Sequence, residues 1–250
     1  MSEFEVQNIS RAFAGIQAVD GFSFHWGEHR IVGLIGPNGA GKTTLFNILT
    51  GFLQADSGNF YLNGENILGL LPHRILKKGI ARTFQDLRLL RQIRVIENVL
   101  LWQQKSTGEE PFSAWLRGKK YRRERQRNLK KAKEILEFVG LIEKANDLAE
   151  ALSYGQQKLL SLGCVLASDA KYLFLDEPVS GMNPQMIEKI LQLLVELAKQ
   201  GKRIFLIEHH IDAVRTLCDW LVVMDEGKKI AEGIPSEVLQ REEIIEAYLD

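Results

Sequence analysis

Cysteine is scarce in this sequence of 250 residues, and the two that occur, Cys164 and Cys218, stand far apart. Neither has a second cysteine or a histidine at a spacing typical of metal ligands, so a cysteine-based metal site is not predicted. Both lie in apolar stretches with helical periodicity. We therefore expect two reduced thiols that pack in the core.

Long apolar runs are missing as well. No stretch approaches the roughly 18 consecutive apolar residues that a transmembrane helix needs. The first ten residues contain Glu3 and Glu5 and no apolar run, so a signal peptide is not predicted. We therefore expect a protein that is cytosolic, or that is held at a membrane by something else.

An excess of either charge is also absent, because 32 basic residues balance 32 acidic ones. This balance argues against a dedicated nucleic-acid binder, which usually carries a basic surface. With 45% hydrophobic and 26% charged residues, the composition is that of a soluble globular protein. The length allows one large domain or two small ones, and no internal repeat is visible.

What stands out instead is a glycine-rich stretch at 36–44, which reads G-P-N-G-A-G-K-T-T. It contains G-x-x-x-x-G-K-T, the spacing of the phosphate-binding loop called Walker A. An apolar run at 30–35 predicts a strand before it, and 42–51 predicts a helix after it. Backbone N–H groups and the positive end of the helix favour phosphate at such a point. Lys42 is then expected to reach the phosphates, and Thr43 to hold Mg²⁺.

Further strands and helices alternate along the chain. Apolar or alternating runs predict strands at 4–9, 22–26, 57–62, 80–85, 172–176, 203–207, 221–224 and 228–231. Helical periodicity predicts helices at 71–78, 95–103, 128–139, 152–167 and 184–200. The first two strands are expected to pair antiparallel. This order as a whole predicts an α/β fold, with a mainly parallel sheet and helices on its faces.

Ligands of such sheets bind at the carboxyl ends of the strands. Five candidate residues directly follow predicted strands, so one edge can gather all of them: Gly36, Gln85, Asp176, Glu177 and His209. Asp176 follows Y-L-F-L, where a Walker B motif places the aspartate that organises Mg²⁺. At the end of its own strand, Gln85 can ligate Mg²⁺ or orient water.

Two smaller features have more than one interpretation. Phe13, in a loop before the glycine-rich stretch, either stacks on adenine or anchors its own loop through apolar contacts. Ser153 suits the N-cap of a helix, and that helix start is a second potential anion site.

A basic run occupies residues 117–127, with seven positive charges against Glu124. The simplest interpretation is a solvated loop and helix start. A second is contact with anionic lipid headgroups, helped by Trp115 and Tyr121. A nucleic-acid patch is the third.

Taken together, the motifs resemble the ATP-binding subunit of an ABC transporter, in that family's order and over essentially the whole chain. They are Phe13, Walker A at 36–44, Gln85 as the Q-loop, the signature L-S-Y-G-Q at 152–156, Walker B ending at Asp176, Glu177, the D-loop at 180–184 and His209. More narrowly, the stretches G-P-N-G-A-G-K-T-T-L-F-N, A-R-T-F-Q, V-I-E-N-V-L, L-I-E-H-H and E-A-Y-L, with the basic insert, are similar to the ATPase subunits of branched-chain amino acid importers.

Three positions depart from the general pattern. Tyr154 replaces a glycine of L-S-G-G-Q, and Asn183 stands where the D-loop usually has aspartate. Both variants resemble the branched-chain subfamily. His210 stands where that subfamily more often has aspartate, so two adjacent histidines are candidates to face the nucleotide, and the resemblance selects His209.

The resemblance implies a single ABC-type nucleotide-binding domain over 1–250, with a mainly parallel P-loop sheet and an antiparallel β subdomain. Residues 1–85 and 159–250 form its nucleotide-binding core, and 86–158 form an inserted helical subdomain with the signature. It also implies ATP and Mg²⁺ as cofactors, and an ATPase activity coupled to transport.

Roles for single residues follow from the same resemblance. Glu177 is the general base for the attacking water, and His209 contacts the γ-phosphate. Gln85 senses Mg²⁺ and water, while Asp176 organises Mg²⁺ through water. The residues expected to hold this chain's own nucleotide are Phe13, Gly36, Pro37, Asn38, Gly39, Ala40, Gly41, Lys42, Thr43 and Thr44. Those expected to cap the γ-phosphate bound by a different subunit are Ser153, Gly155 and Gln156.

The resemblance also implies partners. A second ABC ATPase subunit, homologous or identical, closes an ATP-sandwich dimer, and two membrane permease subunits dock against 86–103. An external substrate-binding protein takes part indirectly, nucleic acid does not, and the chain sits peripherally on the cytoplasmic face of the inner membrane. One alternative is another cargo, such as urea, short amides or exported lipopolysaccharide. Another is an ABC ATPase of DNA repair or translation, although no heptads of a long coiled coil appear.

Overall fold

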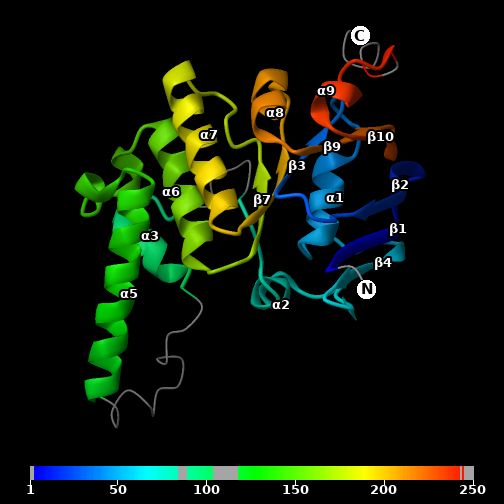
Figure 1. Cartoon of the computed structure of the whole chain (residues 1–250). Coiled ribbons are helices and arrows are strands. Elements are labelled where there is room, and N and C mark those ends of the chain that lie inside the picture. Colours follow the sequence, from blue (N-terminus) through cyan, green and yellow to red (C-terminus); the bar gives the residue numbers. More distant parts are fainter. Residues whose placement is uncertain (1–2, 84–88, 104–117, 243, 245–250) are drawn as a thin grey trace.

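The computed structural model describes residues 3–83, 89–103, 118–242 and 244 (Figure 1). Its centre is a six-stranded sheet in the order β10-β9-β3-β8-β7-β6. The strands are β3 (Ile31–Ile35), β6 (Ile80–Arg82), β7 (Tyr172–Asp176), β8 (Arg203–Ile207), β9 (Trp220–Asp225) and β10 (Lys228–Gly233). All neighbours pair in parallel except β10, which returns antiparallel to β9. Strands β3 and β7 are buried along their whole length, as the apolar runs predict.

A second, antiparallel sheet has the order β2-β1-β4-β5. It consists of β1 (Phe4–Phe13), β2 (Ile16–His25), β4 (Ser57–Leu62) and β5 (Glu65–Asn66). Strands β1 and β2 are joined by Ala14 and Gly15, which both have positive φ, as in the two-residue turns that suit hairpins. The predicted antiparallel pairing is confirmed. Both strands are longer than predicted, so Phe13 ends a strand and does not lie in a loop.

Helices fill the space around the two sheets. They are α1 (Lys42–Leu49), α2 (Pro72–Lys77), α3 (Val95–Leu101), α5 (Gly118–Phe138), α6 (Tyr154–Ala167), α7 (Pro184–Lys199), α8 (Ile211–Leu217) and α9 (Pro235–Val238). In Figure 1, α3, α5 and α6 lie together on the side of the molecule opposite the antiparallel sheet. Helix α7 lies between this helical group and the rest of the parallel sheet. The predicted α/β class, with a mainly parallel sheet, is confirmed.

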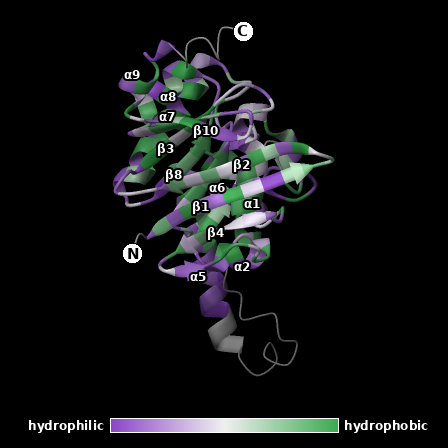
Figure 2. Ribbon diagram, turned by 90° about the vertical axis from the view of Figure 1, so that its right-hand side faces the viewer, coloured by the Kyte–Doolittle hydropathy of each residue, from purple (hydrophilic) through white to green (hydrophobic). Residues whose placement is uncertain are grey.

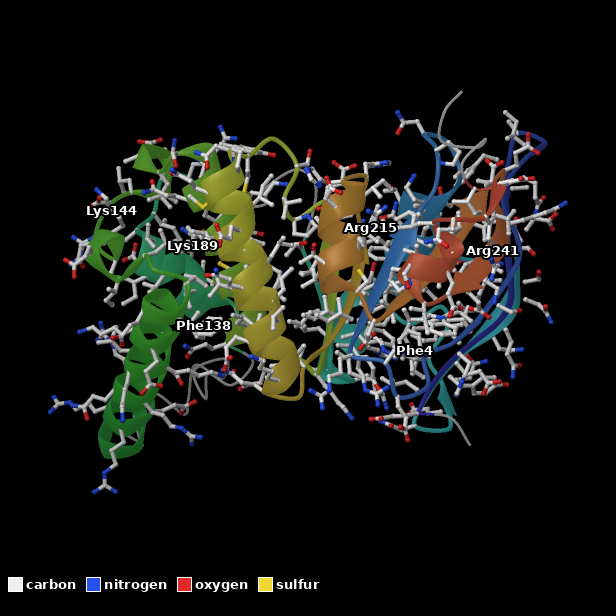
Figure 3. All side chains as sticks on the ribbon, turned by 45° about the horizontal axis from the view of Figure 1, so that its top comes forward. Phe4, Phe138, Lys144, Lys189, Arg215 and Arg241 are labelled. Atoms are coloured by element: carbon white, nitrogen blue, oxygen red, sulfur yellow. The ribbon has the colours of Figure 1, made fainter. Side chains whose placement is uncertain are left out.

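The core between the two sheets is aromatic. Phe4 and Phe24 from the antiparallel sheet meet Phe174 and Phe205 from the parallel sheet, and Phe46 of α1 contacts the last two at 5.0 Å between ring centroids. Figure 3 shows Phe4 directed into this layer. Aromatic side chains bury large areas and pack in defined geometries. This core therefore holds α1, which follows the glycine-rich loop, in a defined position against β7 and β8.

The second core lies under the helices and includes both cysteines. Cys164 on α6 and Cys218 at the end of α8 are free and buried, which confirms the prediction. Burial raises the pKa of the Cys164 thiol to about 12. Phe138 at the end of α5 packs against the same core, beside α7 (Figure 3).

The predicted start of one helix is wrong in an informative way. Helix α5 begins at Gly118, ten residues before the predicted start at 128, and its described outer turns are hydrophilic (Figure 2). Within the predicted range 128–139, Leu129 is exposed, whereas Ala132, Leu136 and Val139 are buried. The early part of the helix projects past the body of the molecule (Figure 1). Residues 122–127, the described side chains of this part, include no buried residue, so the sequence there has no apolar stripe.

Candidate active site

The glycine-rich loop follows β3 and ends where α1 begins. Gly41 is the N-cap of α1 with φ of 94°, and no side chain caps the free N–H groups of this helix start. A Cβ on Gly41 would lie 2.1 Å from the carbonyl oxygen of Ala18, and one on Gly36 would lie 2.0 Å from that of Met224. Only glycine fits at these two points. The loop is therefore pressed between β2 and β9, with its N–H groups available to an anion.

Lys42 is buried at the first position of α1. Its Nζ donates to the carbonyl oxygens of Gly36 and Pro37, both at 2.7 Å. Burial lowers the pKa of this ammonium, against the opposing effect of the nearby Glu177 and Asp176 carboxylates. A cation is thus held over the loop, where phosphate oxygens would offer it stronger, charged acceptors.

Asp176 ends β7 and is buried in an ion pair with Arg82, whose Nη2 lies 2.7 Å from Oδ2. Arg82, in β6, also donates to Oδ1 of Asn47 on α1 at 2.6 Å. The guanidinium therefore ties the Walker B aspartate to the helix of the Walker A loop. The sequence analysis did not identify Arg82. The signal that could have found it is a charged residue within a predicted buried strand, I-A-R.

The oxygen donors near this edge fit Mg²⁺. Thr43 offers an exposed hydroxyl on the first turn of α1, and Asp176 offers a carboxylate. Among the residues that the structure describes, no cluster of three or more His, Cys, Asp or Glu side chains can enclose a metal by itself. Mg²⁺ is commonly held by one or two protein oxygens together with phosphate and water. Gln85, the third predicted ligand, lies outside the described residues.

Glu177 stands next, in a backbone conformation that non-glycine residues seldom adopt. Its φ is 48°, and its Oε1 lies 3.2 Å from Nε2 of His209, which follows β8. Such left-handed residues concentrate at functional sites. His210 has another task, because its Nδ1 accepts from the N–H of Ala213 and caps α8. Of the two adjacent histidines, His209 is the one that contacts Glu177.

The signature residues are placed at the start of α6. Ser153 is the N-cap and forms a capping box with Gln156, in which each side chain accepts a backbone N–H of the other. Gly155 lies so close to α7 that a Cβ there would be 3.2 Å from Met186. Tyr154 packs against Gly181, where an added Cβ would be 3.1 Å from its ring. The departure from L-S-G-G-Q thus puts an aromatic ring on the D-loop.

Two further predicted features stay interpretations. Phe13 ends β1 with a partly exposed ring, and the guanidinium of Arg11 lies 4.8 Å from its centroid. Within the basic insert, Arg122, Arg123, Arg125 and Arg127 are exposed along α5. Neither stacking on adenine nor contact with lipid or nucleic acid is tested by these positions.

Two more buried charged residues were missed by sequence reasoning. Lys158 lies on α6, two positions after the signature, and its Nζ donates to the carbonyl oxygen of Glu177. Glu208 lies directly before His209, and its Oε1 accepts from the N–H of Val179 at 3.0 Å. Both surround the segment that carries Glu177.

Comparison with known proteins matches the geometry. The family model of the ABC transporter matches residues 19–180. The high-affinity branched-chain amino acid transport ATP-binding protein BraF of Pseudomonas aeruginosa is 37% identical over 98% of this chain and 96% of its own length. The corresponding protein LivG of Escherichia coli is 37% identical, with the same shares covered. The probable LivG of Methanocaldococcus jannaschii is 36% identical over the whole of this chain.

Solved structures agree. A nucleotide-free ATP-binding cassette from an ABC transporter has a TM-score of 0.85 and 34% identity, with both chains covered completely. An ATP-binding cassette of an ABC transporter in its ADP conformation has a TM-score of 0.84 and 32% identity, over 100% of this chain and 99% of its own.

The phosphate loop lies at the carboxyl edge of a parallel sheet, and an aspartate and a glutamate stand at the end of the next strand but one. This arrangement defines a nucleotide-binding P-loop ATPase. Within that class, the chain belongs to the ABC transporter family, whose cassettes bind and hydrolyse ATP.

Proposed function

We propose that the chain is the ATP-hydrolysing subunit of an importer for branched-chain or other hydrophobic amino acids. The observation that carries this cargo is the full-length likeness to BraF and LivG, at 36–38% identity across bacterial and archaeal relatives. The observation that carries the chemistry is the contact between Glu177 and His209 at the sheet edge that also holds the phosphate loop.

ATP is held by this chain's own Walker A loop. The N–H groups between Gly36 and Thr44 surround the phosphates, Thr44 lies toward the α-phosphate, and Lys42 exchanges its two carbonyl acceptors for phosphate oxygens. Pro37, Asn38, Gly39, Ala40 and Gly41 shape the loop. We assign Thr43, Asp176 and Gln85 to Mg²⁺, which when bound neutralises phosphate charge. Phe13 is the proposed contact for adenine.

Hydrolysis needs a group that takes the proton of the attacking water. Glu177 fills that role, because its carboxylate is anchored at one oxygen by His209 and stands one residue beyond the Mg²⁺ ligand. We assign His209 itself to the γ-phosphate. Arg82 fixes Asp176 through their buried ion pair.

A second cassette, identical or homologous, completes the site. Ser153, Gly155 and Gln156 of one subunit cap the γ-phosphate held by the other. Among the described residues, no hydrogen bond of Ser153 or Gln156 leads to this chain's own phosphate loop. The fold is shared with dimeric cassettes of known structure, with a TM-score of 0.77 at 22–23% identity. ATP is then the ligand that joins two cassettes, and hydrolysis releases them.

Permease subunits dock against the segment 86–103 in this proposal, and a substrate-binding protein acts outside. A cavity of about 140 Å³ beside the described part of that segment is lined by Trp102, Phe52, Pro72 and His73 among others. Within the described part of the chain, none of the helices has the length and apolarity to cross a membrane. In this proposal the chain is a peripheral subunit on the cytoplasmic face, with 1–85 and 159–250 as core and 86–158 as helical subdomain.

The test is purification of the tagged chain from detergent-solubilised membranes, with partners identified by mass spectrometry. We expect two polytopic permeases and a second ABC ATPase, together with ATP hydrolysis by the complex. Recovery of ribosomal or DNA-repair proteins in their place would contradict the transport function. Permeases for urea or lipopolysaccharide would contradict only the cargo.

A further inference from the structure

A buried lysine that has no role in the mechanism so far contacts the backbone of Glu177. Lys158 stands on α6, four residues after Tyr154, and its Nζ donates to the main-chain carbonyl oxygen of Glu177. The ammonium also lies 5.5 Å from the ring centroid of Tyr154. Burial lowers the pKa of Lys158, while the carboxylates of Glu208, Glu177 and Asp176 oppose that shift. Burying a charge costs free energy, so a buried ammonium of this kind needs a structural or functional explanation.

The acceptor of this bond is unusual. Glu177 has a φ of 48°, a conformation that costs a non-glycine residue free energy and persists only where its surroundings hold it. Its N–H is bound by the carbonyl oxygen of Ile207 at 3.0 Å. Its own carbonyl oxygen accepts from Lys158 and, at 3.3 Å, from the N–H of Ser180. The peptide groups on both sides of Glu177 are thus held, one by β8 and one by α6.

Glu208 holds the next part of the chain. Its Oε1 accepts from the N–H of Val179 at 3.0 Å, and its Oε2 accepts from the N–H of His209 at 3.2 Å. One buried carboxyl therefore joins the segment after Glu177 to the residue that Glu177 contacts. Burial raises the pKa of Glu208, and the bound N–H groups and Lys158 oppose that shift.

We infer that Lys158 is a positioning residue for hydrolysis. It ties the signature helix of a chain to the general base of the same chain, and Glu208 holds the N–H groups of Val179 and His209 on either side of that base. This inference rests on the proposed function. The signature at the start of α6 touches the nucleotide of the partner, whereas Glu177 acts on the nucleotide of its own chain. Helix α6 has Ser153 at its N-cap and Lys158 in its second turn, and it therefore links the two nucleotides of a dimer.

The first test replaces Lys158 by methionine, which keeps length and loses both charge and donor. We expect kcat for ATP to fall at least about tenfold, as loss of a charged hydrogen bond implies, with KM changed by less than about twofold. A normal kcat in Lys158→Met would contradict the inference. Wild-type hydrolysis is measured first, since its absence would contradict the proposed function and not this role.

The chain offers a matched control in Lys202. Its Nζ also donates to a main-chain carbonyl oxygen, that of Ala170 at 2.7 Å, and burial also lowers its pKa. It stands before β8, at the edge of the sheet away from Glu177. Lys202→Met is expected to lower the melting temperature as Lys158→Met does and to keep kcat. An equal loss of kcat in both variants would reduce Lys158 to a structural role.

Two further variants keep the test decisive if Lys158→Met does not fold. Lys158→Arg keeps charge and donors, and a cavity of about 20 Å³ beside Lys158 and Asp176 leaves room for its larger head. It is expected to retain kcat within about threefold. A tenfold loss, by comparison, corresponds to about 1.4 kcal/mol of activation free energy. Glu208→Gln is expected to lower kcat with unchanged KM. A large loss in the first or none in the second would overturn the assignment.

The link to the signature has its own measurement. Ser153→Ala and Lys158→Met are assayed singly and together. If the signature acts on Glu177 through Lys158, the combined loss of kcat is smaller than the product of the two single losses. A combined loss equal to that product would show that the two residues act independently, and would remove the link.

Discussion

At the scale of single residues, the site depends on where Glu177 directs its carboxylate. Its Oε1 lies 3.2 Å from Nε2 of His209, at the sheet edge that also holds the phosphate loop. We expect Glu177→Gln to keep ATP binding and to lower turnover by at least about 10²-fold, the contribution of a general base. Turnover is measured by phosphate release and binding by nucleotide titration. Glu188→Gln, on the exposed face of α7, is the control, and unchanged turnover in Glu177→Gln would remove the residue from this role.

Lys42 supports a prediction about binding. Its buried ammonium, which donates to two carbonyl oxygens of the loop, supplies a positive charge at the proposed phosphate site. Lys42→Ala is expected to abolish tight ATP binding, because the loop N–H groups alone then face the phosphate charge. A fluorescent nucleotide titration measures this, with Lys199→Ala at the end of α7 as control. Normal affinity in Lys42→Ala would contradict the assignment.

The residues that sequence reasoning missed share one property. Arg82, Lys158 and Glu208 are buried charges whose partners come from distant parts of the chain. The partner of Arg82 is Asp176, which only the pairing of β6 with β7 brings near. A motif reports residues that are near in sequence, so Walker A and Walker B could be read. Arg82, which joins Asp176 to the helix after Walker A, could not.

At the scale of elements, α7 shows how a motif residue can serve the fold. Asn183, the D-loop departure, is its N-cap, and its Oδ1 accepts from the N–H of Met186 at 2.9 Å. Pro184 follows at the first helical position, where it is favoured. We expect Asn183→Ala to lower the free energy of unfolding by about 1 kcal/mol, and Asn183→Asp to keep it, since aspartate caps equally well. Denaturant unfolding measures both, and equal stability of all three proteins would contradict the cap.

Elements with a strong local signal were predicted closely. Strand β4 has the predicted bounds, and Asn63 and Gly64 after it both adopt positive φ. Strand β7 also has the predicted bounds, because a fully buried parallel strand reads as a continuous apolar run. The start of α5 could not be predicted, because its described outer residues, 122–127, include no buried side chain. The subdomain boundaries remain a proposal.

At the scale of the whole molecule, the signature at the start of α6 serves a nucleotide that another chain holds. We expect Glu177→Gln with ATP to elute as a dimer in size-exclusion chromatography, alone or with the second cassette that purifies with it. Without ATP, or with Ser153→Arg, we expect separate chains, since the bridging ligand or its second contact is lost. Equal elution with and without ATP would contradict an ATP-joined dimer.

The close contacts of the glycine-rich loop have a consequence for biosynthesis. Gly41 is pressed by Ala18, which the ribosome supplies early, but Gly36 is pressed by Met224, which arrives near the end of translation. Strand β9, which contains Met224, also pairs with β3 directly before the loop. A nascent chain therefore contains its complete Walker A sequence long before β9, the strand that contacts Gly36, has been synthesised. We therefore expect nucleotide binding only after β9 has emerged, so that ATP stabilises the finished chain and not an unfinished one.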